Sequence, residues 1–234
     1  MRVYEEPAFV LHLKSYRETS ALVDFFTLNQ GRVSVVAHGV RSKKSRRPIQ
    51  PFGLSNISYT GKSQLKTLTQ LELTSHYWLE GQHLYAGIYL NELLVRLTGH
   101  EDPHPILFEG YSEAISGLAQ RSELEPLLRR FELLLLRESG YGICFDMDVQ
   151  TGAPIQQSEF YRFQPDVGFT RSNASGGKTY PGSILMAIGM GDYSKASTRR
   201  CAKHLMRQAL RPHLGTKPLH SRSLFQQIRE KFPV

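Results

Sequence analysis

Five short runs of apolar and β-branched residues in the first third of the chain most strongly constrain its fold. They cover residues 7–13, 21–28, 32–37, 52–59 and 65–73. Gly31 and Gly61 lie in turns between them, where glycine supplies the positive φ that tight turns need. Five short strands at this spacing are typical of a small barrel and predict an OB-fold. An SH3-like barrel that binds no nucleic acid is the alternative.

The hydrophobic period changes near Trp78, where helical spacing replaces strand spacing. Apolar residues recur every three to four positions in residues 84–97, 107–118 and 124–139, and again from about residue 202 to 210. The predicted class is therefore α+β. We expect an OB-fold domain at 1–78, a helical domain at 79–142, a small irregular subdomain with a β-hairpin at 143–185, and C-terminal helices at 186–234 that pack on the helical domain.

The charge of the chain changes sign along its length. Residues 1–79 carry eleven Lys/Arg against five Asp/Glu, residues 80–142 carry five against ten, and residues 143–234 carry thirteen against six. A net charge of +8 favours an anionic partner. The segmental asymmetry predicts different tasks for the basic ends and the acidic middle.

A cationic segment connects the third and fourth predicted strands. Five of the seven residues from 41 to 47 are Lys or Arg, and such a segment between strands suits a phosphate backbone. A solvated loop is the alternative. Phe52 and Tyr59 are the candidates for base stacking, although either could belong to the core. The candidate DNA-binding residues are Arg32, Arg41, Lys43, Lys44, Arg46, Arg47, Lys62 and Lys66.

A second basic surface is predicted after residue 198, where nine cations face one acid, Glu230. Helical spacing places three of these cations on one face, with Leu205 toward the core. Such a face could bind phosphates or an acidic peptide with an apolar end; pairing with the acidic middle segment is the plain alternative. The candidate protein-partner groove comprises Arg129, Arg130, Arg200, Lys203, Leu205 and Arg207.

No catalytic, metal or cofactor motif supports an enzyme. The chain has neither a Walker loop nor a Gly-x-Ser-x-Gly motif. Asp146 and Asp148 lack a third group, and His100 and His104 lack further ligands. No run of 18 apolar residues and no signal-peptide pattern is present, so we expect no membrane association and a cytoplasmic, nucleoid-associated location.

A series of short motifs extends along nearly the whole chain. They are Phe9-Val-Leu-His12, Arg17-Glu-Thr-Ser20, Gly31-Arg-Val-Ser-Val-Val-Ala-His-Gly-Val-Arg-Ser-Lys43, Gln50-Pro-Phe52, Tyr89-Leu-Asn-Glu-Leu-Leu94, Leu128-Arg-Arg-Phe-Glu-Leu133 with Leu135-Leu136, Gly140-Tyr-Gly142 and Leu214-Gly-Thr-Lys-Pro-Leu-His-Ser-Arg222. Together they resemble the motifs of the bacterial recombination mediator family RecO. Each is weak alone, but their order makes chance agreement improbable.

The resemblance implies binding of single- and double-stranded DNA, annealing of complementary strands, and cooperation with RecR in loading RecA onto DNA coated by single-strand-binding protein. It also implies docking of the acidic tail of single-strand-binding protein, which would suit the predicted groove. Many family members carry a four-cysteine zinc site, whereas Cys144 stands alone here. We therefore expect a zinc-free subdomain. A basic adaptor or an RNA-binding OB-fold protein without annealing activity is the alternative.

Overall fold

The computed structural model describes residues 1–41, 49–172, 179–221 and 224. The chain forms two compact units, one comprising Met1–Ser122 with Leu219–Val234 and the other Glu123–Pro218. The predicted division into four segments stays a prediction. Each unit is described by itself.

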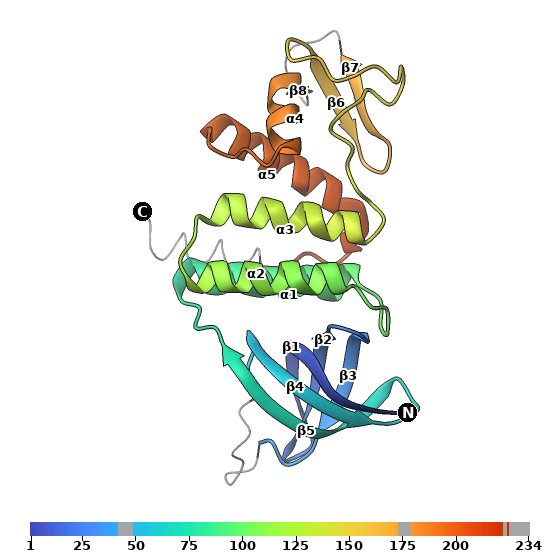
Figure 1. The fold of residues 1–234 in the computed structure, drawn as a ribbon, viewed down its shortest axis with the longest axis vertical. Helices are drawn as coiled ribbons and strands as arrows, with labels where there is room; N and C mark the ends of the chain where they lie inside the picture. The colour runs from blue at the N-terminus through green and yellow to red at the C-terminus, as the bar shows by residue number, and fades with distance from the viewer. Residues whose placement is uncertain (42–48, 173–178, 222–223, 225–234) are drawn as a thin grey trace. The chain divides into compact units, whose positions relative to one another are not determined.

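The first unit begins with a closed five-stranded sheet (Figure 1). Its strands are β1 (Arg2–Tyr16), β2 (Ser20–Thr27), β3 (Gly31–Ala37), β4 (Gly53–Thr60) and β5 (Leu65–His76). They pair in the order β1-β2-β3-β5-β4, and β1 also pairs with β4, so the sheet closes on itself. Only the β3–β5 pairing is parallel. The OB-fold prediction is confirmed, and every predicted strand is present.

Both faces of the barrel wall are buried on the β1–β2 side. Ala8, Val10, Val23 and Phe25 point into the barrel core. Their neighbours point outward to aromatic residues of the following helices: the Phe9 and Tyr111 ring centroids are 5.0 Å apart, and those of Phe26 and Phe108 are 5.7 Å apart. Because successive side chains of a strand point to opposite faces, the same strands contribute to the barrel core and to the core between the barrel and the helices.

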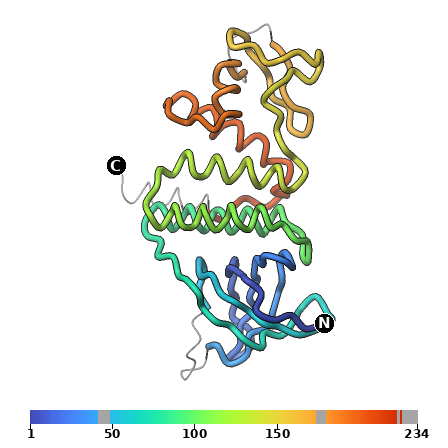
Figure 2. The backbone as a smooth tube through the Cα atoms, in the orientation of Figure 1, coloured from blue at the N-terminus to red at the C-terminus, as the bar shows by residue number. Residues whose placement is uncertain are grey.

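Two helices, α1 (Gly81–Leu97) and α2 (Pro105–Ala119), cover this outer face and run antiparallel to each other (Figure 2). The buried amide of Asn91 donates a hydrogen bond to the Leu11 carbonyl at 3.0 Å, and the Tyr111 hydroxyl donates to Asn91 at 2.6 Å. Burial raises the pKa of Tyr111, which keeps its hydroxyl protonated as the donor. These bonds fix the register of α1 on β1.

The connection between α1 and α2 folds back onto the start of β3. Gly31 has φ +67°, and a Cβ atom there would lie 2.1 Å from the Asp102 carbonyl oxygen. The Glu101 N–H donates to the Arg32 carbonyl at 3.0 Å. Glycine is therefore required at position 31 both for the turn and for this close approach.

The second unit contains a helical pair and a small sheet. Its elements are α3 (Leu124–Glu138), β6 (Phe160–Gln164), β7 (Gly168–Ser172), β8 (Thr179–Pro181), α4 (Gly182–Gly189), α5 (Ala196–Leu210) and η1 (Arg211–Leu214). The sheet order is β7-β6-β8, and α3 packs against α5. The predicted hairpin is confirmed as β6 and β7. The short elements β8 and α4 were not predicted, because three and eight residues carry too little periodicity.

No helix within the described ranges is both long and apolar enough to cross a membrane. The α+β class predicted from the two hydrophobic periods is confirmed.

Candidate nucleic-acid interface and partner site

The described beginning of the cationic segment is held against the β1–β2 turn. The Arg41 N–H donates to the Thr19 carbonyl at 2.9 Å, and Arg41 Nη1 donates to the Arg17 carbonyl at 3.3 Å. The Arg17 guanidinium carbon lies 5.2 Å from the centroid of the Tyr16 ring. Both arginines are exposed, and within the described ranges neither pairs with a carboxylate. Two exposed arginines therefore lie beside each other at one end of the barrel, where an anion can reach them.

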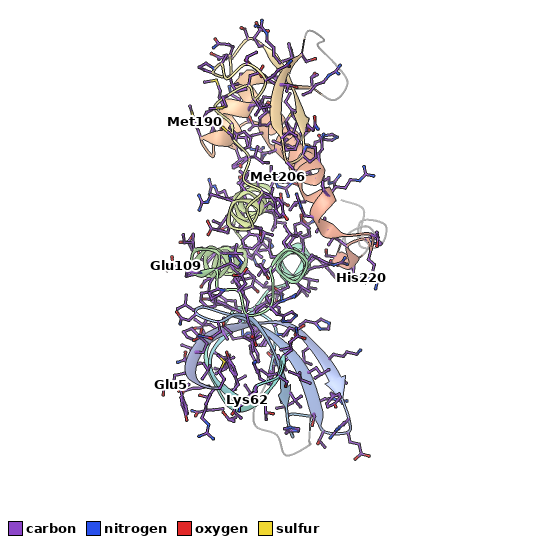
Figure 3. The ribbon with its side chains drawn as sticks, turned by 90° about the vertical axis from the view of Figure 1, so that its right-hand side faces the viewer. Glu5, Lys62, Glu109, Met190, Met206 and His220 are labelled. Carbon is purple, nitrogen blue, oxygen red and sulfur yellow. The ribbon has the colours of Figure 1, made fainter. Side chains whose placement is uncertain are left out.

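Other predicted DNA contacts lie elsewhere or outside the described residues. Lys43, Lys44, Arg46 and Arg47 fall in the undescribed range 42–48. Lys62 is exposed between β4 and β5, on the barrel (Figure 3). Arg17 was missed as a candidate, although it begins the RecO-like motif at residues 17–20.

Arg32 and Lys66 are buried between the barrel and the α1–α2 connection. Arg32 Nη1 donates to the Val95 carbonyl at 2.6 Å. Burial lowers the pKa of Arg32, and the nearby Asp24 acts in the opposite direction. Lys66, whose side chain is 4% exposed, pairs with Glu101 at 2.6 Å. Because internal acceptors already hold these two cations, they are poorly placed to neutralise phosphates.

Phe52 and Tyr59 are core residues, with 5% and 1% exposure. Burial, with Glu6 and Glu101 nearby, raises the pKa of Tyr59 to about 12. A Cβ atom at Gly87 of α1 would lie 2.8 Å from the Phe52 ring, so the glycine makes room for that ring. Neither aromatic side chain presents a face to a base.

The residues of the predicted partner groove lie on α3 and α5, within the second unit. Arg130, Arg200 and Arg207 are exposed, whereas Leu205 is buried, as predicted for the core side of α5. Lys203 Nζ pairs with Glu125 Oε1 at 2.6 Å. This pair is one contact of the kind that the alternative describes, between the basic end and the acidic middle of the chain.

Arg129 differs from its neighbour Arg130. Its side chain is buried, and its Nη2 donates to Glu132 Oε1 at 2.7 Å, three residues along α3. Tyr193 is also buried in this region, and burial raises its pKa to about 12 despite the opposing effect of Arg129 and Arg130. The structure therefore places Arg129 inside the unit, and Arg130 on its surface.

The carboxylate of Asp148 is hydrogen-bonded both to a nearby turn and to a strand of the small sheet. Asp148 accepts hydrogen bonds from the backbone N–H groups of Gln150, Thr151 and Arg171, at 2.8, 3.2 and 2.9 Å. Burial would raise the pKa of Asp148, but these bonds, with the Thr151 hydroxyl, lower it overall. The carboxylate joins the 148–152 turn to β7.

The residues of this subdomain do not fit a four-cysteine zinc site. The chain has two cysteines, exposed Cys144 and half-buried Cys201. Across the part of the chain that the structure describes, no group of three or more His, Cys, Asp or Glu residues could hold a metal ion. The carboxylate oxygens of Asp148 already accept hydrogen bonds from backbone N–H groups.

Two family models match consecutive parts of the chain. The model described as "Recombination protein O N terminal" matches residues 1–77, and "Recombination protein O C terminal" matches residues 78–223. The chain belongs to the recombination protein O family, RecO. The first RecO model covers the barrel through β5, and the second begins at Trp78. The family resemblance noted from the sequence motifs is confirmed.

Curated RecO proteins match the chain over nearly its full length. "DNA repair protein RecO" of Stutzerimonas stutzeri is 46% identical over 226 residues, covering 96% of this chain and 94% of that protein. The proteins of the same name from Cellvibrio japonicus and Haemophilus influenzae are 44% and 43% identical, covering 96% and 94% of this chain and 98% and 94% of their own lengths.

Proposed function

We propose that this RecO family member acts in DNA repair and recombination by binding single- and double-stranded DNA and annealing complementary strands. Family membership and the name of its relatives support this role. The observation that carries it is the fixing of Arg41 beside Arg17, because the cationic segment 41–47 starts from that exposed arginine pair. With RecR, the protein would help RecA replace single-strand-binding protein.

The proposed mechanism is neutralisation of phosphate charge. Two complementary strands repel each other through their phosphates, and cations on a protein surface reduce that repulsion while releasing condensed counterions. No covalent step is required, so the proposed role is not enzymatic. Such a role belongs in the cytoplasm, on nucleoid DNA.

We further propose that the exposed cations of α3 and α5 receive the acidic tail of single-strand-binding protein. Arg130, Arg200 and Arg207 are exposed on neighbouring helices of one unit. A carboxylate-rich peptide would find bidentate donors there, and it would compete with Glu125 for Lys203. Buried Arg129 and Leu205 would support this surface from beneath.

The decisive experiment measures annealing of complementary oligonucleotides, bare and coated with single-strand-binding protein. We compare the wild type with a variant that has alanine at Arg41, Lys43, Lys44, Arg46 and Arg47. The variant should anneal bare strands at least tenfold more slowly. A matched control, Arg162→Ala with Lys195→Ala, removes exposed cations outside both proposed sites and should anneal normally.

Three results would redirect the assignment. Normal annealing by the five-alanine variant would transfer strand binding to the α5 face. Tighter binding of RNA than of matched DNA, with no annealing, would favour an RNA-binding OB-fold protein. If the protein bound no nucleic acid at all, the remaining interpretation would be a basic adaptor that binds other proteins.

A further inference from the structure

Trp78 is exposed to an unusual degree. It is the one tryptophan in the sequence, it connects β5 to α1, and it is 75% exposed. Tryptophan side chains are strongly buried on average, because they carry a large apolar area. The exposed indole of Trp78 is therefore a candidate contact for a binding partner.

The backbone on both sides of Trp78 is anchored. The preceding Tyr77 N–H donates to the Phe52 carbonyl at 3.2 Å. The following Leu79 is buried at the Gly87 notch, where a Cβ atom would lie 2.6 Å from Leu79 Cδ1. Figure 2 follows this short connection from β5 into α1. The backbone that carries Trp78 is therefore held in place on both sides of the exposed side chain.

His76 contacts the indole of Trp78. The two ring centroids are 4.6 Å apart, with an interplanar angle of 65°. His76 pairs with Gly53 across β4 and β5, and a Cβ atom at position 53 would lie 3.7 Å from His76 Cδ2. A neighbouring ring in this arrangement limits rotation of the indole, and the large exposed area of Trp78 remains for a further ring.

Trp78 lies next to the start of β4. The Phe52 carbonyl accepts a hydrogen bond from the Tyr77 N–H, and Gly53, the first residue of β4, pairs with His76. The adjacent acid, Glu80, is paired with Arg121 at 3.0 Å, so the immediate surroundings are close to neutral. A DNA strand that passes the start of β4 would bring a base to the indole.

We propose that Trp78, oriented by His76, stacks on a base of single-stranded DNA. The proposal rests on the proposed function and adds a base contact to it. Stacking on an aromatic ring suits a protein that must accept any sequence, because every base has a π-face. It also supplies the aromatic contact that the buried Phe52 and Tyr59 cannot make.

The test uses two readouts on the full chain. Anisotropy of a labelled oligonucleotide reports binding through any surface, whereas intrinsic tryptophan fluorescence reports only Trp78. Single-stranded DNA should quench that fluorescence in step with the anisotropy. An abasic strand of equal length carries the same phosphates without bases, and it should bind without the same quenching.

Variants separate stacking from general binding. Trp78→Ala should bind single-stranded DNA roughly tenfold more weakly, Trp78→Phe should recover most of the loss, and binding of the abasic strand should be unchanged in both. Met190→Ala, which removes a side chain that is 78% exposed in the other unit, should behave as wild type. Equal thermal unfolding of the variants excludes a folding defect.

Each remaining outcome is decisive. DNA binding without quenching, together with full affinity of Trp78→Ala, would overturn the stacking site and leave the proposed function intact. Absence of binding by anisotropy would overturn both. Equal losses of Trp78→Ala for intact and abasic strands would also overturn stacking, because the residue would then act without a base.

Discussion

The carboxylate of Glu92 on α1 accepts both the backbone N–H and the hydroxyl of Ser221, at 3.0 and 2.7 Å, across 129 residues of sequence. The His220 N–H adds a third bond, at 2.9 Å, and His220 lies beside α1 (Figure 3). Backbone N–H groups at the start of a helical turn lack internal partners. Glu92 supplies those partners, so one side chain ties the returning chain to the first unit.

Glu92→Gln should loosen the returning segment. The amide keeps one acceptor but loses the negative charge, and hydrogen bonds to charged groups contribute about 1.5–3 kcal/mol. We expect at least roughly tenfold faster hydrogen exchange at His220 and Ser221, measured by mass spectrometry. Glu109→Gln alters an exposed acid on α2 and serves as the control. Unchanged exchange in Glu92→Gln would show that the carboxylate does not hold the segment.

The same contact should weaken in acid. Burial acts to raise the pKa of Glu92, but the bonds from Ser221 and His220, with Arg96, lower it overall. A lowered folded-state pKa gives stability that is present above the ordinary carboxyl value, about 4.3, and is lost as pH falls through the folded value. Exchange at Ser221, corrected for its intrinsic pH dependence, should therefore accelerate only below about pH 4. Acceleration near pH 6 would point to a histidine instead.

Asp148→Asn should destabilise the small sheet of the second unit. The substitution replaces a buried carboxylate that three backbone donors share, and we expect a loss of about 2–3 kcal/mol. Urea unfolding should be followed by circular dichroism, because Trp78 reports on the other unit. Asp146→Asn alters an exposed neighbour and should change stability by less than about 0.5 kcal/mol. Equal effects of the two variants would contradict the role of Asp148.

The salt dependence of DNA binding should distinguish exposed cations from buried ones. Each contact with a single-strand phosphate contributes about 0.7 to the slope of log affinity against log salt. Arg17→Ala with Arg41→Ala should therefore reduce the slope by about 1.4, as measured by anisotropy titrations. Lys66→Ala should leave the slope unchanged, because Lys66 is held by Glu101. If Lys66→Ala reduced the slope, Lys66 would have to be counted among the residues that contact DNA.

Neighbouring arginines of α3 should have opposite effects on stability and binding. Arg129→Ala leaves the buried Glu132 without its ion-pair partner, and breaking a buried pair costs about 3–5 kcal/mol. Arg130→Ala should cost less than about 0.5 kcal/mol, yet should weaken binding of an acidic tail peptide. Denaturant titration and peptide anisotropy would measure the two effects. A stable Arg129→Ala would show that the pair is not structural.

The strands and helices were predictable because their signals are local. Short runs of apolar and β-branched residues, separated by turns, indicated the five strands, and a change of period near Trp78 indicated the helices. The motifs around Gly31 and residues 214–222 indicated the family in the same way, because each is a short run of residues. Short elements such as β8 were not predicted, since three residues are too few to show a hydrophobic period.

The availability of each cation and aromatic ring depended on tertiary structure. Arg32 and Lys66 carry the same charges as Arg41, but contacts with Val95 and Glu101 bury them. Phe52 fills the notch at Gly87, whereas Trp78 remains outside. The amino-acid sequence by itself determined the elements, the family and the charge of each segment. Only the tertiary structure decided which of those side chains face solvent, because burial results from contacts between residues far apart in the chain.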